Sequence, residues 1–436
     1  MSNILEQHEY NVKKGPFHED ASFLPQAGID SYPLRYIAYY LPQFHPIEVN
    51  DVAWGRGFTE WTNSTKALPR YAGHYQPRLP ADLGFYSLEN VDVIREQARL
   101  AKRGGVYGFC IHYYWFSGRK VLDKPLTVLL ENTDIDMPFF INWANESWTR
   151  TWDGSEQQVL LKQNYSDEDP LRFVQAAADI MQDKRYIRID GRPLIMIYRP
   201  SVVPNVQKTV ETWREFLIKA GLGNPYIIMP QAFGDKDPRR YGLDAAAGFP
   251  PHNSGFALPS DRWKIKTFDP DFVGAVVSYE KMVSQALANR PTDFKYFPGV
   301  CPSWDNEARR PKRGFSFYGS TPQKYGDWLR AASEQALSAS SPDERIVFIN
   351  AWNEWAEGTY LEPDRHFGFA YLAETRRALE RFRQSGLDQK PASKNIKRQK
   401  KNVSDEFMTT PRFYNQLRSF IFALRRPIRE KRKGSE

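Results

Sequence analysis

Short apolar or β-branched runs alternate along this chain with segments of helical period, a pattern typical of a parallel sheet covered by helices. Eight runs read as strands, which begin near Arg35, Val106, Pro138, Pro193, Pro225, Leu243, Lys295 and Arg345. The seventh is the weakest, because Pro298 cannot donate a ladder hydrogen bond inside a central strand. Eight strand and helix units predict an α/β protein with a (β/α)₈ TIM barrel.

The segments between the strands carry the start and stop signals of outer helices. Apolar positions repeat at helical spacing over residues 91–101 and 206–217, and each run ends shortly before a glycine. Asp169-Pro170 and Thr321-Pro322 each read as a capping residue followed by proline at the first helical position. A doubly wound sheet is the alternative, but residues 41–45, after the first strand, lack its glycine-rich turn.

The predicted carboxyl ends of the strands carry amides, imidazoles, carboxylates and indoles. In a barrel these ends converge on one mouth, where the chemistry of the fold takes place. A sugar needs such a mixture, because its hydroxyls take hydrogen bonds while its C–H faces pack on aromatic rings. We therefore predict a carbohydrate-binding mouth formed by Tyr40, Gln43, His45, Trp61, His112, Tyr113, Trp115, Asn142, Trp143, Asn145, Glu146, Gln231, Trp304, Asn353 and Trp355.

Three of these assignments have alternatives. Glu146 is an acid or base, a hydroxyl ligand or a structural rim carboxylate. His112 is expected to contact the ligand, whereas His45 fits equally well as a hydrogen-bonded histidine behind the site. The connection over residues 43–85, which contains Trp61, is too long for a bare link, so it either shapes the mouth or packs over the barrel end.

The strongest local signal is the strand at 346–350 that runs into Glu354 and Glu357. Three positions apart in a turn, two carboxylates lie close enough for one negative charge to raise the pKa of the other. Glycosidic-bond chemistry uses such a pair: one carboxyl protonates the leaving oxygen while the other is nucleophile or base. The alternative is two ion pairs with arginines at the rim. Trp352 and Trp355, which we expect to desolvate the pair, favour catalysis.

Metal and phosphate chemistry have little support in the sequence, and we predict no cofactor. No His-x-x-x-His, His-Glu-x-x-His or Cys-x-x-Cys spacing occurs. Asp-x-Asp triplets at 134–136, 235–237 and 269–271 resemble the manganese-binding pair of nucleotide-sugar transferases, but such triplets occur by chance in a chain of this length. The glycine pairs at 104–105 and 221–223 end helices instead of opening them.

Several motifs together resemble the WbsX-type proteins of surface-polysaccharide gene clusters, which are related to glycoside hydrolase family 99. The resemblance covers about residues 34–384. Its motifs are Tyr39-Tyr40-Leu41-Pro42-Gln43-Phe44-His45-Pro46, Gly57-Phe58-Thr59-Glu60-Trp61-Thr62-Asn63, Gly73-His74-Tyr75-Gln76-Pro77-Arg78-Leu79-Pro80, Trp143-Ala144-Asn145-Glu146 and Asn353-Glu354-Trp355-Ala356-Glu357-Gly358.

The resemblance implies a mechanism as well as a barrel. Family 99 enzymes look like endo-acting α-mannosidases that retain configuration because the sugar's own 2-hydroxyl attacks the anomeric carbon. By motif, Glu354 resembles the residue that deprotonates this hydroxyl to form a 1,2-anhydro intermediate, and Glu357 resembles the acid/base. Ala356 stands where the mannan-cleaving enzymes usually carry histidine, so the resemblance does not extend to mannose specificity.

Composition and charge set the tail apart from the rest of the chain. The 436 residues include 12 Trp, 23 Tyr and 28 Phe, which suits a cleft that stacks its ligand, and two Cys, which excludes a disulfide scaffold. From Gly386 onward, 14 Lys and Arg stand against five Asp and Glu; this net +9 leaves about −1 of the total +8 for the first 385 residues. A basic stripe for nucleic acid is therefore not expected.

We accordingly divide the chain into an N-terminal extension (1–33), the catalytic barrel (34–384) and a basic linker with an amphipathic helix (385–436). Phe413, Leu417, Phe420, Ile421 and Leu424 share one helical face bordered by arginines, a pattern that favours binding to anionic lipid. The alternatives are docking of this helix onto the barrel and a disordered cationic end.

The sequence thus predicts an enzyme that cleaves or transfers glycosidic bonds of a surface polysaccharide or its lipid-linked oligosaccharide precursor. Without a leader or spanning segment, we expect it in the cytoplasm, and at the inner membrane if the tail binds lipid. Two rival functions remain: a nucleotide-sugar glycosyltransferase of lipopolysaccharide synthesis and a non-catalytic glycan-binding protein.

Overall fold

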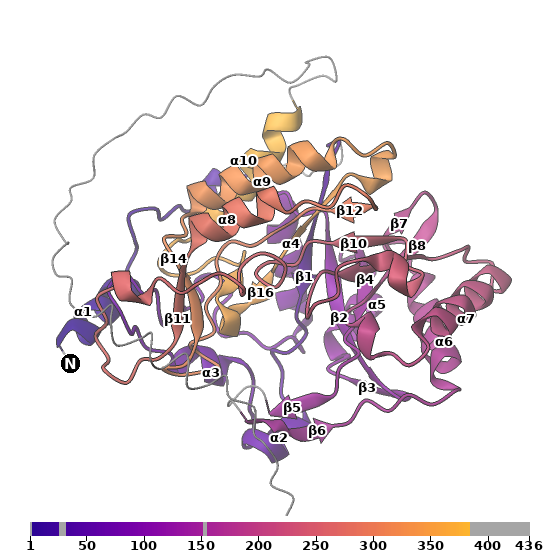
Figure 1. Ribbon diagram of the computed structural model, residues 1–436, viewed down its shortest axis with the longest axis horizontal. Coiled ribbons are helices and arrows are strands. Elements are labelled where there is room, and N and C mark those ends of the chain that lie inside the picture. The colour runs from indigo at the N-terminus through magenta and orange to yellow at the C-terminus, as the bar shows by residue number, and fades with distance from the viewer. Residues whose placement is uncertain (1, 26–31, 151–154, 384–436) are drawn as a thin grey trace, which may run out of the picture. The chain divides into compact units, whose positions relative to one another are not determined.

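A barrel of parallel strands forms the centre of the computed structural model, which describes residues 2–25, 32–150 and 155–383 (Figure 1). The chain divides into residues 1–386 and 387–436. The predicted linker and amphipathic helix of the tail lie outside the described residues. Around the barrel the strands follow one another as β12, β10, β9, β8, β4, β2, β1, β15 and β13. Their bounds are β1 Arg35–Tyr40, β2 Gly108–Phe116, β4 Phe139–Trp143, β8 Arg192–Ile197, β9 Tyr226–Pro230, β10 Ala245–Ala247, β12 Tyr296–Phe297, β13 Gly299–Val300 and β15 Ile346–Ile349.

The barrel closes through the short strands β12 and β13, which only Pro298 separates. β12 pairs with β10, and β13 pairs with β15. Pro298 has no N–H to donate, but its carbonyl accepts a hydrogen bond from Phe348 N at 2.8 Å. Counted as one strand, β12 and β13 complete the eight strands that the sequence predicts, so the (β/α)₈ barrel is confirmed.

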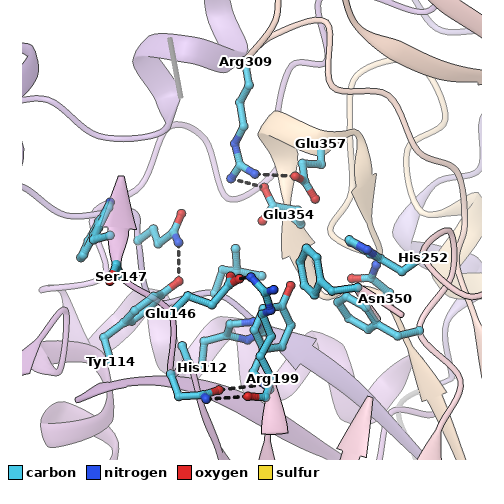
Figure 2. Close-up of a pocket in the computed structure, with 18 of the residues that line it drawn as sticks. His112, Tyr114, Glu146, Ser147, Arg199, His252, Arg309, Asn350, Glu354 and Glu357 are labelled. Atoms are coloured by element: carbon cyan, nitrogen blue, oxygen red, sulfur yellow. Dashed lines mark hydrogen bonds and ion pairs between the residues drawn. The ribbon is translucent and has the colours of Figure 1, made fainter. Parts of the chain in front are cut away.

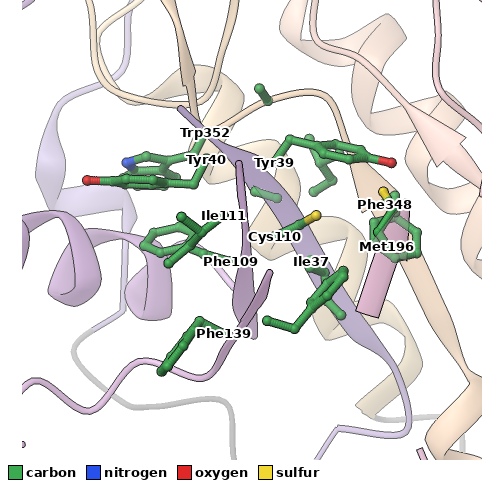
Figure 3. Close-up of a cluster of buried hydrophobic side chains, with 14 of the residues drawn as sticks. Ile37, Tyr39, Tyr40, Phe109, Cys110, Ile111, Phe139, Met196, Phe348 and Trp352 are labelled. Carbon is green, nitrogen blue, oxygen red and sulfur yellow. The ribbon is translucent and has the colours of Figure 1, made fainter. Parts of the chain in front are cut away.

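Side chains of the barrel strands β1, β2 and β15 alternate between the barrel interior and the surrounding helices, as the period of two residues requires. In Figure 3, Tyr39, Cys110 and Phe348 lie on one side of the strands, whereas Tyr40 and Phe109 lie on the other. The ring of Phe348 contacts Tyr39 with centroids 5.6 Å apart. Parallel strands are thus buried on both faces, which explains their nearly continuous apolar sequence.

Helices cover the outside of the barrel (Figure 1). The run at 91–101 forms α4, and the run at 206–217 forms α7, as predicted. Thr321 caps α9 as expected, since its side chain accepts a hydrogen bond from Lys324 N. The outer helices are α4 Val91–Arg103, α5 Lys124–Glu131, α6 Asp169–Met181, α7 Val206–Lys219, α8 Tyr279–Ala288, α9 Pro322–Ala336 and α10 Ala370–Arg383.

The predicted cap of α6 is wrong by one residue. The helix starts at Asp169 itself, and Glu168 takes the cap position without a side-chain cap. Asp169 instead turns inward and accepts a hydrogen bond from Trp115 Nε1 at 3.3 Å. Asp169 therefore accepts a hydrogen bond from the Trp115 indole of β2 and does not cap the helix.

Smaller elements complete the described residues. Helix α1 (Ser2–Asn11) precedes the barrel, and α2 (Glu48–Trp54) and α3 (Trp61–Lys66) belong to the long connection after β1. The remaining strands are β3 Arg119–Val121, β5 Trp148–Arg150, β6 Ser155–Leu161, β7 Arg188–Ile189, β11 Ala275–Ser278, β14 Phe315–Tyr318, β16 Asn353–Glu354 and β17 Thr359–Tyr360. Within the described part of the chain, none of the helices has the length and apolar character needed to span a bilayer.

Truncation of Phe348 tests the packing inside the barrel. Phe348 is fully buried and contacts Tyr39, Phe140 and Phe297. We expect Phe348→Ala to lower the free energy of unfolding by about 3–5 kcal/mol, because it removes a ring and leaves a cavity. Denaturant unfolding measures this, with Val52→Ala as the exposed control, which should change stability by less than about 0.5 kcal/mol. Equal midpoints for Phe348→Ala and wild type would contradict the packing.

Candidate active site

A short hairpin after β15 carries both predicted catalytic glutamates. Glu354 lies in β16, which pairs antiparallel with β17, and a 3₁₀ turn over Trp355–Glu357 joins the two strands. Gly358 ends the turn with φ of +60°, and a Cβ there would lie 2.7 Å from Arg78 Nε. Both the dihedral angle and the close approach require glycine at this position. The predicted turn is therefore present.

One guanidinium holds the two carboxylates together (Figure 2). Arg309 donates from Nη2 to Glu354 Oε1 at 2.9 Å and from Nη1 to Glu357 Oε1 at 2.7 Å. Its Nε donates to Glu60 Oε2 at 2.9 Å, so three carboxylates surround one cation. Trp304 adds a hydrogen bond from Nε1 to Glu357 Oε2 at 3.3 Å. The arginine contact of the alternative prediction is thus present.

The two glutamates differ in burial and therefore in their surroundings. Glu354 is 5% exposed, whereas the side chain of Glu357 is 27% exposed. Burial raises the pKa of Glu354 well above its usual value; Arg309 opposes this shift, and the negative charges of Glu357 and Glu60 add to it. Glu354 therefore holds a proton at a higher pH than an ordinary glutamate does.

Both carboxylates line a cavity of about 910 Å³ at the carboxyl ends of the strands, together with Arg309. Five of the predicted binding residues line it as well: Gln43, His112, Asn145, Glu146 and Trp304. Its wall is otherwise aromatic and polar, with Tyr114, Phe116, Trp148, Tyr165, Tyr198, Phe233, Phe249, His252, Phe256, Asn306, Phe315 and Asn350 among the lining residues. Hydrogen-bonding groups and rings thus face the same space as the glutamate pair.

A second ion pair lies elsewhere in the same cavity, between Glu146 and Arg199 (Figure 2). The Arg199 guanidinium also lies 4.4 Å from the ring centroid of Phe233.

Burial lowers the pKa of His112 and of His252, which also line the cavity, to about 4, so both imidazoles are neutral at pH 7. A neutral imidazole offers one donor and one acceptor, which suits a sugar hydroxyl.

The other ten predicted binding residues are absent from the described lining of the cavity. His112 and Tyr114 line it, so Tyr113 and Trp115, on the opposite face of β2, pack outward against Phe173 of α6. The other eight are hydrogen-bonded elsewhere or buried. Tyr40 and Trp355 donate to the side chains of Gln97 and Glu362, and Asn353 binds the Leu41 backbone. Backbone carbonyls accept from the remaining donors: Trp61 donates to Tyr86 O, Trp143 to Trp115 O and Gln231 to Lys236 O, while His45 and Asn142 are buried.

The indoles beside the glutamates do not face the cavity in the way the sequence suggested. Trp352 is buried against Phe109, and Trp355 stacks on Tyr360 with centroids 3.8 Å apart. The cavity wall next to Glu357 is instead formed by Trp304, which packs on Phe256 and Phe315. The 3₁₀ turn explains the difference, because it directs the Trp355 indole away from the two glutamates and toward Glu362.

Arg309 and Glu60 were not identified from the sequence, and Arg199, which stands at the predicted end of a strand, was left out of the predicted binding residues. Glu60 stands inside the motif at 57–63, but neither its position nor that of Arg199 indicates a partner. Arg309 lies nine residues beyond β13 in an irregular segment, so no periodicity places it. The weak available signal was a requirement of charge: two buried glutamates need a cation nearby.

The described residues contain no group of three or more His, Cys, Asp or Glu side chains arranged to hold a metal ion. Aspartates of the three Asp-x-Asp triplets have protein partners. Arg95 pairs with Asp134, Arg239 with Asp237, and Arg70 with Asp269. These carboxylates therefore take part in local ion pairs.

The chain is similar to a known protein family over most of its length. The family model described as Glycosyltransferase WbsX matches residues 36–375. The chain belongs to this WbsX family. A relative from Xanthomonas campestris pv. campestris, the uncharacterized protein WxcX, is 44% identical over 353 residues, which are 81% of this chain and 50% of the relative. The same protein from strain B100 matches over the same shares. The WbsX-family chain thus spans about half the length of these curated relatives.

Two solved structures share the barrel of this WbsX-family protein. One is a glycoside hydrolase-like protein with a TM-score of 0.52 and 17% identity, covering 82% of this chain and 96% of the other. The other is the family 99 endo-α-mannosidase from Bacteroides thetaiotaomicron in complex with Bis-Tris-propane, with a TM-score of 0.51 and 18% identity, covering 81% and 98%. The likeness covers about four fifths of this chain and shows a glycoside hydrolase-like fold.

Removal of Arg309 tests the three-carboxylate cluster. The side chain is 12% exposed, and Glu60 is 1% exposed, so Arg309→Met leaves buried carboxylates uncompensated. We expect the free energy of unfolding to fall by about 3–5 kcal/mol at pH 7. The loss should shrink toward pH 4, because the buried Glu354 carboxyl, whose pKa is raised, is then protonated and no longer needs a cation beside it.

Chemical denaturation at both pH values measures the effect. Arg95→Met removes an exposed ion pair with Asp92 and Asp134 and should cost at most about 1 kcal/mol. A loss for Arg309→Met that is the same at pH 7 and pH 4 would contradict an electrostatic role for this cluster.

Proposed function

We propose that this protein is a carbohydrate-active enzyme that cleaves or transfers a glycosidic bond, with Glu354 and Glu357 as its catalytic pair. One observation carries the proposal: two carboxylates of unequal burial share Arg309 and line a large aromatic and polar cavity at the barrel mouth. Catalytic residues of this fold lie at that end of the strands. The cavity volume also lies within the usual range for small-ligand sites, about 300–1,000 Å³.

The proposed first step uses the buried glutamate as the base. Ionised Glu354 takes the proton of the sugar 2-hydroxyl, and this oxygen attacks the anomeric carbon while the glycosidic bond breaks. Glu357 gives its proton to the leaving oxygen. Burial raises the pKa of Glu354, which makes its ionised form a stronger base. The more exposed Glu357 lies on the side where a leaving group and water can reach it.

In the proposed second step, Glu357 accepts a proton from water or from an acceptor hydroxyl, whose oxygen attacks the anomeric carbon of the 1,2-anhydro sugar. The 2-oxygen regains its proton from Glu354. Both carboxyls return to their starting state, and the two inversions give net retention. Water leads to hydrolysis, and an acceptor sugar leads to transfer.

We propose a surface polysaccharide or its lipid-linked precursor as the substrate, on the strength of the family alone. Mannose is not part of the proposal. The position at which the mannan-cleaving enzymes usually carry histidine is Ala356 in this chain, and its side chain is fully buried against Ala67 and Ala308 and does not line the described cavity. Aromatic and hydroxyl-binding groups in the wall support a glycan in general. Contact of the basic tail with anionic lipid, and with it a place at the inner membrane, stays a prediction.

A glycosyltransferase that uses a sugar nucleotide is the second candidate, favoured by the description of the family. Calorimetric titration with sugar nucleotides and Mn²⁺ separates the two, because the proposed mechanism needs neither. A non-catalytic glycan-binding protein is the third; for such a protein, Glu354→Ala would leave the cellular function intact.

Substitution of each glutamate tests the assigned roles. A screen of α-linked oligosaccharides, with products identified by mass spectrometry, first selects a substrate for the wild type. We expect Glu354→Gln and Glu357→Gln each to lower kcat by about 100-fold or more, because an amide neither accepts nor gives the required proton. A 2,4-dinitrophenyl glycoside of the same sugar should restore bond cleavage in Glu357→Gln, since its leaving group needs no proton, but not in Glu354→Gln.

Exposed Glu168→Gln is the matched control and should keep wild-type rates. Full activity of Glu357→Gln on the natural linkage would show that the acid/base is another residue.

The pH dependence of the reaction tests the state of Glu354. The first step needs one proton in the pair, held by Glu357 while Glu354 is ionised, and the pair loses its last proton as the pH rises through the raised pKa of Glu354. We therefore expect kcat/KM to fall on the alkaline side, as the pH rises through this pKa, which lies well above 4.5, the usual value for a glutamate. A rate profile without this alkaline limb would rule out the assignment.

A further inference from the structure

Glu362 is a buried carboxyl that lies just beyond the catalytic hairpin but does not line the described cavity. It follows β17 by two residues and is 2% exposed. Its backbone N donates to Trp352 O at 3.2 Å, which joins the two ends of the hairpin. Glu362 therefore sits at the base of the segment that carries Glu354 and Glu357.

Three neutral groups donate hydrogen bonds to this carboxyl. Tyr86 OH and Trp355 Nε1 reach Glu362 Oε2 at 2.8 and 2.7 Å, and Gln97 Nε2 reaches Oε1 at 2.6 Å. Tyr86 belongs to the long connection after β1, and Gln97 belongs to α4. One carboxyl therefore ties an outer helix and the connection to the catalytic hairpin.

The bond to Trp355 is the one that reaches the proposed chemistry. Trp355 stands between Glu354 and Glu357 in the 3₁₀ turn, and its indole stacks on Tyr360 of the returning strand at 3.8 Å. On the far side of the turn, Asp305 N donates to Glu357 O at 2.6 Å. The turn is thus held from two directions, by a side-chain carboxyl on the Glu362 side and by a backbone hydrogen bond on the other.

Stability alone does not explain a carboxyl at this position. Burial raises the pKa of Glu362 to about 7, which reflects the cost of removing its charge from water. Well-packed apolar residues often replace buried ionic groups with no loss of stability. A carboxyl nevertheless offers several acceptor sites in a fixed geometry, enough to orient the indole while it also binds Tyr86 and Gln97.

We propose that Glu362 is a positioning residue, which holds the Trp355 indole and thereby fixes the turn so that Glu354 and Glu357 face the cavity together. The catalytic consequence rests on the proposed function of that pair. The positional consequence does not, because it concerns only where the hairpin lies. A displaced turn admits water to Glu354, and its pKa then falls toward the usual value.

The test compares Glu362→Gln, Trp355→Phe and the double variant in the full-length chain. Carboxyl ¹³C NMR, with Glu354→Gln used for assignment, gives the pKa of Glu354 without any substrate. We expect a lower Glu354 pKa in both single variants, and no decrease in the double variant beyond that of Trp355→Phe, because Glu362→Gln weakens the same hydrogen bond that Trp355→Phe removes. On the oligosaccharide that the wild type cleaves, kcat should fall by about 10- to 100-fold, with a smaller change in KM.

Asp169→Asn is the matched control, since it alters a buried carboxyl that accepts from an indole, Trp115 Nε1, on another side of the barrel. It should lower stability but leave the Glu354 pKa and kcat as in the wild type. If Glu362→Gln does not fold, Trp355→Phe alone decides, because it keeps Glu362 with its two other donors.

The outcomes separate the two proposals. A wild type that cleaves none of the oligosaccharides, with a lowered Glu354 pKa in Trp355→Phe, would reject the function and support the positioning role. An unchanged Glu354 pKa in Trp355→Phe, or equal shifts in Asp169→Asn, would reject the positioning role even in an active enzyme.

Discussion

The arrangement depends on one guanidinium that serves three carboxylates. Arg309 binds Glu60, Glu354 and Glu357, and two of these acids are almost completely buried. One positive charge cannot balance three negative charges in a place with little water, so the cluster favours retaining a proton. Burial and the neighbouring charges direct that proton to Glu354. The proposed first step uses the less populated arrangement of the same charges, in which the single proton lies on Glu357 and Glu354 is ionised.

The barrel explains how residues so distant in sequence reach this cluster. Glu60 follows β1, Arg309 follows β13, and the glutamate pair follows β15. These three strands are neighbours in the order β1, β15, β13, so their carboxyl ends lie side by side. Closure through the proline-split strand is what brings β13 beside β15. The site therefore depends on the strand that the sequence predicts least clearly, because Pro298 interrupts it.

The sequence predicted most of the fold and part of the site, and the difference has a physical cause. Strand runs and helix caps are local patterns, so the barrel and the Glu354–Glu357 turn could be identified. Which face of a strand a residue occupies depends on register. Tyr113 and Trp115 were expected in the mouth, but the residues of β2 that line the cavity are His112, Tyr114 and Phe116. Arg309 lies in an irregular segment, and its partners come from two other connections. No period or spacing encodes such a contact.

The most direct test of this account is a ¹³C NMR titration of the Glu354 and Glu357 carboxyls in the wild-type protein, assigned with the two Gln variants. The account predicts that Glu354 titrates well above 4.5 and that its midpoint falls when Glu357 is replaced by Gln, because a neighbouring negative charge is lost. A Glu354 carboxyl that titrates at or below 4.5, and that does not respond to the replacement of Glu357, would contradict it.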